Sequence, residues 1–316
     1  MDNITHTLVG LMLARTGLEK TTVRGTAMMM LAANAPDIDG IFWFDRLRYI
    51  EYHRGYPHAF AFIPLVALLP MVVARVKFSW RAYVAAMIGV LSHPLIDWTN
   101  PFGTRLLLPF SDHRFRLDIN NLIDVWVWAI LWGAVAATAL SRLVSAEIGD
   151  RKSSGARRGW AWAALLAVLF YMGGRGILHQ RAVNELSSRL YEGAVARNIA
   201  ALPTGSNPLV WRGVVEGDGF AIIVPVNLAG EFDPAAGRIY RQAPPDPAID
   251  AALRKRPFQV FSAFAEMPFW RVTPADDGVE VRLTDLRFGT PDNPGFAGVT
   301  ALVDASGTVR EARFGF

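Results

Sequence analysis

The sequence contains no cysteine. This absence excludes a disulfide framework, a cysteine nucleophile and any thiolate metal ligand. A metal ion bound by this chain must therefore take nitrogen and oxygen ligands. Only six histidines are available for that purpose.

The N-terminal stretch MDNITHTLVGLMLAR lacks the basic region and the A-x-A cleavage motif of a secretory signal, so we expect it to remain attached. The chain also lacks an uncharged run of about 20 residues, the length of a complete membrane span. Its mean hydropathy of +0.24 and its 52% of hydrophobic residues are nevertheless high for a soluble protein. Several short apolar segments must account for these values.

Four charge-free stretches are candidates for membrane spans. Tryptophans 80, 98, 126, 128, 160 and 162 mark their ends, as in an interfacial belt, and this favours spans over a soluble bundle of buried helices. Each span must borrow flanking residues or lie in a thinned bilayer. The four stretches are residues 59–74, 82–96, 125–141 and 160–174.

Two shorter apolar pieces, residues 4–14 and 25–35, predict a helical hairpin that is too short to cross a bilayer alone. Eleven basic residues lie at the hairpin tip and after the first and third predicted spans, against seven on the opposite side. The positive-inside rule then makes those three connections cytoplasmic and places both termini outside.

From about residue 177 the pattern becomes that of a soluble α/β domain. It predicts helices over 181–200 and 245–266, and three β-hairpins. The hairpin turns are expected at 217–219, at 276–278 and at 304–307. The predicted fold is an N-terminal all-α, multi-span membrane bundle (1–178) followed by an extracytoplasmic α+β domain with an antiparallel sheet (179–316).

Most of the unusual polar residues fall at one end of the predicted helices. His93 and Asp97 are four residues apart, which places both on one helix face, provided that the helix starts or kinks at Pro94. Asp37 and Asp39 form an Asp-x-Asp turn suited to cations. Alone, each such residue is usually solvated or a helix cap. Together they predict a metal site made of His6, Asp37, Asp39, His53, His58, His93 and Asp97.

Four arginines are expected on the same side as this site. Guanidinium groups recognise phosphate through paired hydrogen bonds, although arginines beside spans also meet lipid headgroups. Asp124, inside the third predicted span, is costly in hydrocarbon, so we expect it to support the ligands or to pair with an arginine, Arg105. The four arginines are Arg54, Arg105, Arg114 and Arg116.

The motifs MDNITHTLVG, APDID, HRGYPHA, SHPLIDWTNPFGTRLLLPFS and RFRLDINNLIDVW resemble those of the membrane-bound metal-dependent hydrolases of bacteria, the YdjM-type family. The resemblance covers about the first 130 residues. It implies a multi-pass protein of the bacterial inner membrane. The family often has Thr-His-Ser where this chain has Pro57-His58-Ala59, which removes a hydroxyl beside His58.

The order of the candidate ligands also resembles that of the zinc-dependent phospholipases C and their related nucleases. Those enzymes bind three zinc ions and need two further histidines and a glutamate, whereas here His113 and His179 lack the matching spacing. One or two ions are therefore expected, zinc first, although manganese and iron suit the same ligands. The matched positions are His6, Asp39, His53, His93 and Asp97.

These observations predict a hydrolase that cleaves a phosphate ester, with a lipid-linked phosphate as the expected substrate, the bilayer as its partner and no nucleic acid. Asp37, Arg54 and Asp124 are the predicted catalytic residues, and His58 completes the coordination or orients a ligand. The main alternative is a non-catalytic membrane protein with a structural metal site, whose C-terminal domain binds an envelope partner. Transport fits less well, because only Asp124 approaches the middle of the membrane.

Overall fold

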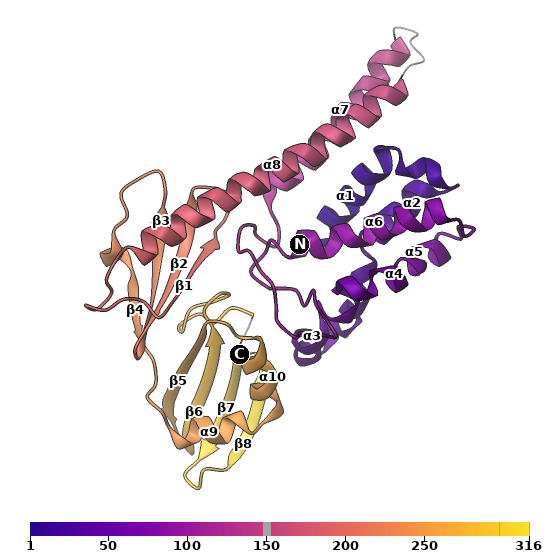
Figure 1. Cartoon of the computed structure of the whole chain (residues 1–316). Helices are drawn as coiled ribbons and strands as arrows, with labels where there is room; N and C mark the ends of the chain where they lie inside the picture. Colours follow the sequence, from indigo (N-terminus) through magenta and orange to yellow (C-terminus); the bar gives the residue numbers. More distant parts are fainter. Residues whose placement is uncertain (148–152, 297, 316) are drawn as a thin grey trace. The chain divides into compact units, whose positions relative to one another are not determined.

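The computed structural model describes residues 1–147, 153–296 and 298–315, and the chain divides into two compact units (Figure 1). The first unit comprises Met1–Gly40 and Arg54–Ile177. The second comprises Ile41–His53 and Leu178–Phe316. The short segment 41–53 therefore belongs with the C-terminal residues, which the sequence pattern did not indicate.

The predicted N-terminal hairpin is confirmed as helices α1 (Asn3–Arg15) and α2 (Gly25–Ala32), with the short helix η1 (Leu18–Thr21) between them. Helix α1 starts where it does because the Asp2 carboxylate accepts hydrogen bonds from the backbone N–H groups of Ile4 and Thr5. The two helices approach closely at Gly10, where an added Cβ would lie 2.7 Å from the carbonyl oxygen of Met29.

We expect Gly10→Ala to lower the free energy of unfolding by about 1–3 kcal/mol, because the methyl group meets backbone atoms that cannot move without shifting α2. Gly133→Ala is the matched control, since a Cβ there meets open space and alanine is the better helix former. Thermal unfolding of both variants in the same detergent checks this expectation. Equal midpoints for the two would contradict it.

Helix α6 (Trp80–Asp97) packs against α2 and against the segment that precedes α6. A hydrogen bond from the Ala82 N–H to the Ser79 hydroxyl caps its start. Of the two expected arrangements at Pro94, a helix start is excluded, because the helix begins at Trp80 and runs on through this proline. The intervening segment contains η2 (Ala35–Phe44), α3 (Arg46–Tyr52), η3 (Tyr56–His58), η4 (Phe60–Phe62), α4 (Ile63–Val66) and α5 (Leu68–Val73).

In the described part of the chain, two helices are long and apolar enough to cross a membrane, or up to three if one bent pair counts as a span. They are α7 (Val125–Glu147) and α8 (Ser153–Ser187), which pack on α1 through an apolar cluster. The prediction of about four spans stays a prediction, because length and composition alone do not test which segments cross a bilayer. Pro64 and Pro70 each lack an N–H donor and lie in a segment divided among η4, α4 and α5, and α6 carries polar residues at both ends.

The second unit contains two separate four-stranded antiparallel sheets (Figure 1), which confirms the predicted α+β fold with antiparallel strands. The three predicted hairpins are confirmed, with the left-handed residues Gly219, Gly278 and Gly307 at their turns. The first sheet contains β1 (Asn198–Pro203), β2 (Val210–Gly217), β3 (Phe220–Asn227) and β4 (Arg238–Arg241), with η5 (Pro234–Ala236) before β4. The second contains β5 (Pro268–Ala275), β6 (Gly278–Asp285), β7 (Gly298–Asp304) and β8 (Val309–Phe314).

Two predicted helices of this unit have different bounds. Helix α8 ends at Ser187, well before residue 200, and its last turns join the buried cluster around Trp211. The region 245–266 forms two helices, α9 (Pro247–Leu253) and α10 (Arg256–Phe264), because Pro257 suits the first turn of a new helix better than the interior of a long one. Both helices contact the second sheet.

Candidate metal centre

The candidate metal centre lies in the first unit, where four chain segments bring polar side chains to one buried place. His6 comes from the first turn of α1, Asp37 and Asp39 from η2, and His58 from the end of η3. The last turn of α6 supplies two more residues of this cluster, His93 and Asp97. The sequence spacing that predicted one shared helix face for this last pair is confirmed.

Four of these side chains form the centre of the cluster. One ligand atom each from Asp37, His58, His93 and Asp97 lies within 4.8 Å of all the others. Nε2 of His58 is 3.4 Å from Asp37 Oδ1 and 3.7 Å from Asp97 Oδ2. Nε2 of His93 is 3.3 Å and 3.5 Å from the same two oxygens.

The protonation of His93 tests whether these residues fit a cation. Its Nδ1 lies 2.7 Å from the carbonyl oxygen of Ala33, which only accepts, so Nδ1 carries the hydrogen. Nε2 then presents a lone pair to two carboxylate oxygens and makes no hydrogen bond within the described residues. Such an arrangement is unfavourable unless a metal ion or a second proton lies between these groups. The donor set therefore fits a divalent ion.

Two further predicted ligands lie at the edge of this cluster. The ring of His6 stacks on that of His93 at 3.7 Å, and its Nε2 is 3.3 Å from Asp97 Oδ1. Asp39 Oδ2 lies 3.2 Å from His58 Nδ1. These two residues are placed to hold a second ion or to orient the ligands of the first.

Charge is compensated unevenly across the centre. Asp97 contacts the Met1 amine and the Arg54 guanidinium, whose Nε is 2.9 Å from Oδ2. Asp37 contacts two imidazoles. Burial by itself would raise the pKa of the Asp37 carboxyl, but the neighbouring imidazoles of His93 and His58 outweigh burial and hold that pKa well below its usual range. Asp37 is therefore ionised at neutral pH.

His53 does not belong to the first unit. It follows α3 directly in the second unit, where it is buried and its ring stacks on Tyr49 at 4.3 Å. Its proposed place among the ligands stays a prediction.

The four predicted phosphate-binding arginines have different surroundings. Arg54 is buried, bonds Asn100 Oδ1 through Nη1 at 2.7 Å, and lies over the ring of Phe102. The guanidinium of Arg114 lies 5.7 Å from the centre of the same ring. The backbone N–H of Arg105 donates to the Arg54 carbonyl, and Arg116 forms an ion pair with Asp118.

Asp124 precedes α7 and caps it, accepting hydrogen bonds from the backbone N–H groups of Trp126 and Val127. The Tyr171 hydroxyl contacts both carboxylate oxygens at 3.1 Å. The carboxylate thus stands at the start of the helix and not inside it, and the expected pairing with Arg105 stays a prediction.

Sequence reasoning missed several groups around the centre. Asn100 follows Asp97 in the DWTN motif, so its position close behind a predicted ligand was a usable signal. The Ala33 carbonyl carried no signal, because a backbone oxygen is present at every residue.

The N-terminal half thus combines two candidate membrane spans with a buried His and Asp cluster. The chain belongs to the YdjM inner membrane protein family, whose model matches residues 1–182. Residues 247–316 match the YfhP C-terminal alpha/beta plait domain. The chain is also similar to the uncharacterized protein YfhP of Bacillus subtilis (strain 168), with 22% identity over 96% of this chain and 91% of the relative. No solved structure matches the chain.

Proposed function

We propose that this chain is a membrane-bound, metal-dependent hydrolase that cleaves a phosphate ester. The observation that carries the proposal is the buried set of ligand atoms from Asp37, His58, His93 and Asp97. Zinc is the expected ion, since it accepts mixed nitrogen and oxygen ligands, and manganese or iron would suit the same set. A bound ion would polarise the phosphate and make an attacking water more acidic.

The roles of the chain's own residues follow from exposure. The side chain of Asp37 is 16% exposed, whereas those of His58, His93 and Asp97 are at most 1% exposed. Substrate must therefore approach from the Asp37 side. As an ionised carboxylate, Asp37 can accept a hydrogen bond from the attacking water and orient it. The Arg54 guanidinium holds Asp97 in place, and the Ala33 carbonyl holds His93.

The surroundings of Asp37 support a lipid-linked phosphate as substrate. A cavity of about 260 Å³ opens beside this residue. Among the described residues that line this cavity, Asp37 is the charged one, and most of the others are apolar. An alkyl chain fits such a wall, while the phosphate lies toward the ion. The lining contains Asn3, Leu31, Asn34, Ala35, Asp37, Ile38, Leu69, Pro70 and Val73.

The charge distribution supports a location in the bacterial inner membrane with the site and the C-terminal domain on the extracytoplasmic side. This orientation follows from the excess of basic residues at the hairpin tip and after the first and third predicted spans, which the positive-inside rule places in the cytoplasm.

Hydrolysis by purified protein loaded with zinc or manganese tests the proposal. We expect cleavage of a lipid phosphate or of a simple aryl phosphodiester, and a loss of about a hundredfold or more in Asp37→Asn. Asp112→Asn, at an exposed position, is the matched control and should keep full activity. A metal-loaded protein that cleaves neither substrate, or an Asp37→Asn variant as active as the control, would refute the proposal.

A structural metal site is the second candidate, and one observation favours it. The Arg54 guanidinium already pairs with Asp97, so a cation there would serve mainly to join helix ends. The C-terminal domain would then bind an envelope partner. Metal bound at full stoichiometry without hydrolysis, with lower stability on chelation, is the result expected for this candidate.

A further inference from the structure

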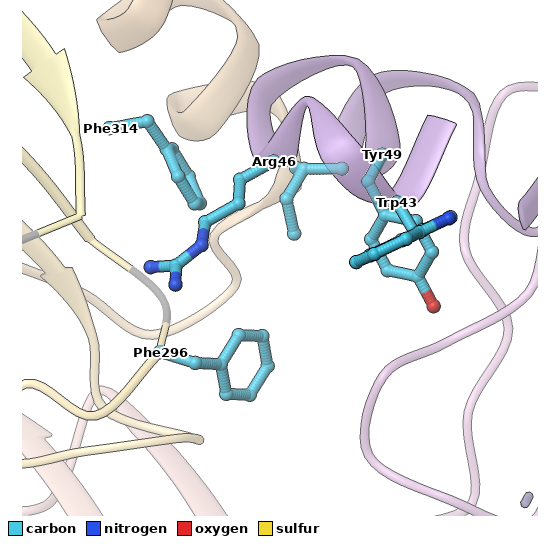
Figure 2. A pocket seen from close by; sticks show the side chains of 6 residues that line it. Trp43, Arg46, Tyr49, Phe296 and Phe314 are labelled. Atoms are coloured by element: carbon cyan, nitrogen blue, oxygen red, sulfur yellow. The ribbon is translucent and has the colours of Figure 1, made fainter. Parts of the chain in front are cut away.

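A second cavity, of about 260 Å³, lies entirely within the second unit, between the segment 41–53 and the end of the chain (Figure 2). Its wall is aromatic and aliphatic, with one cationic side chain, Arg46. Figure 2 shows the Arg46 side chain extending between Phe296 and Phe314, while Trp43 and Tyr49 lie together on the other side. Buried Ile50 completes the lining.

The walls are held by a network of ring contacts. Phe314 packs edge-on against Phe261 of α10 at 5.8 Å, and Phe296 packs against Phe288 at 5.1 Å. An ion pair of 2.8 Å between Arg256 and Glu51 joins α10 to α3. Two of the aromatic walls, Phe296 and Phe314, are thus packed against neighbouring rings, and this packing lowers the cost of ordering them on binding.

Arg46 has no acidic partner within the described residues. The two acids of the same segment are used elsewhere, because Asp45 pairs with Arg48 and Glu51 pairs with Arg256. A guanidinium beside an apolar cavity matches a ligand with one anionic group and an apolar body.

We propose that this cavity binds an anionic phospholipid, with the lipid phosphate on Arg46 and part of an acyl chain against the aromatic wall. Three observations favour a lipid. The chain belongs to an inner membrane protein family, and α8 leads from a candidate span directly into this unit. Trp43 of the lining and its near neighbours in sequence, Ile41 and Phe44, are exposed, and tryptophan is enriched at membrane interfaces.

The volume limits what enters. Pockets for whole small molecules measure about 300–1,000 Å³, so this cavity holds only part of a lipid and leaves the rest in the bilayer. The site is distinct from the metal centre and does not depend on hydrolysis.

Native mass spectrometry of the full chain released from detergent tests the proposal. The probes are phosphatidylglycerol and phosphatidylcholine of equal chain length, with inorganic phosphate as competitor. We expect wild type to prefer phosphatidylglycerol, and Arg46→Gln to weaken its binding about tenfold while binding of phosphatidylcholine is unchanged. Phe296→Ala should weaken binding of both lipids.

Arg48→Gln is the matched control, because Arg48 lies on the same helix, is exposed and pairs with Asp45. Unfolding midpoints close to that of wild type will show that the variants are folded. Equal lipid preference in Arg46→Gln and Arg48→Gln would overturn the proposal. So would binding of inorganic phosphate that displaces phosphatidylglycerol, which would identify a free anion as the ligand.

Discussion

Replacing His93 with alanine is expected to abolish stoichiometric binding of the divalent ion and to lower phosphate ester hydrolysis by about a thousandfold or more. His93 is fully buried, its Nδ1 is fixed by the Ala33 carbonyl, and its Nε2 faces Asp37 and Asp97. Alanine removes Nε2 of His93, a ligand nitrogen whose orientation is set by the hydrogen bond from Nδ1 to a backbone carbonyl. Elemental analysis of purified protein, together with initial rates, measures both effects.

His113→Ala is the control for this prediction. His113 is exposed, and its described ring contact is with Phe115, away from the cluster. We expect it to retain both metal and activity. If His93→Ala keeps the metal content of wild type, the cluster is an ion-pair network and not a metal centre.

Arg54→Lys is expected to weaken metal binding and to lower kcat by about ten- to a hundredfold, the usual effect of losing a group that orients a ligand. The Arg54 guanidinium contacts Asp97 Oδ2 through Nε and Asn100 Oδ1 through Nη1. A lysine ammonium keeps the charge but lacks the fixed fork that spans both oxygens. Titration of apo-protein with zinc, followed by steady-state kinetics, separates these effects.

The same kinetics distinguish a positioning role from the substrate contact that the sequence predicted for Arg54. A substrate contact would raise KM and leave metal affinity unchanged, whereas loss of positioning changes metal affinity and kcat. Arg114→Lys is the useful comparison, because Arg114 lies over the same Phe102 ring and has no described contact with Asp97. Metal affinity equal to wild type in Arg54→Lys would contradict the positioning role.

Features with local causes were predictable from the sequence. The spacing of His93 and Asp97 needs only helical periodicity, and the hairpin turns of the second unit need only glycine at left-handed positions. Predicting that His6, Asp37, Asp39 and His58 lie close to that pair also required the order and direction of the helices. The predicted N-terminal hairpin supplied part of this information, because it places its two ends on the same side.

Features with tertiary causes were not predictable. The placement of segment 41–53 with the C-terminal residues depends on contacts between distant parts of the chain, such as the Arg256–Glu51 ion pair. No residue pattern around Glu51 indicates that partner.

X-ray absorption at the zinc edge of the purified, metal-loaded protein tests the central claim most directly. The account predicts nitrogen and oxygen scatterers at about 2.0–2.2 Å, with the outer-shell signature of at least two imidazoles. One of those imidazoles should disappear in a His58→Ala variant that still retains part of its metal. A spectrum with oxygen ligands alone and no imidazole scattering would contradict the claim that His58 and His93 bind the ion.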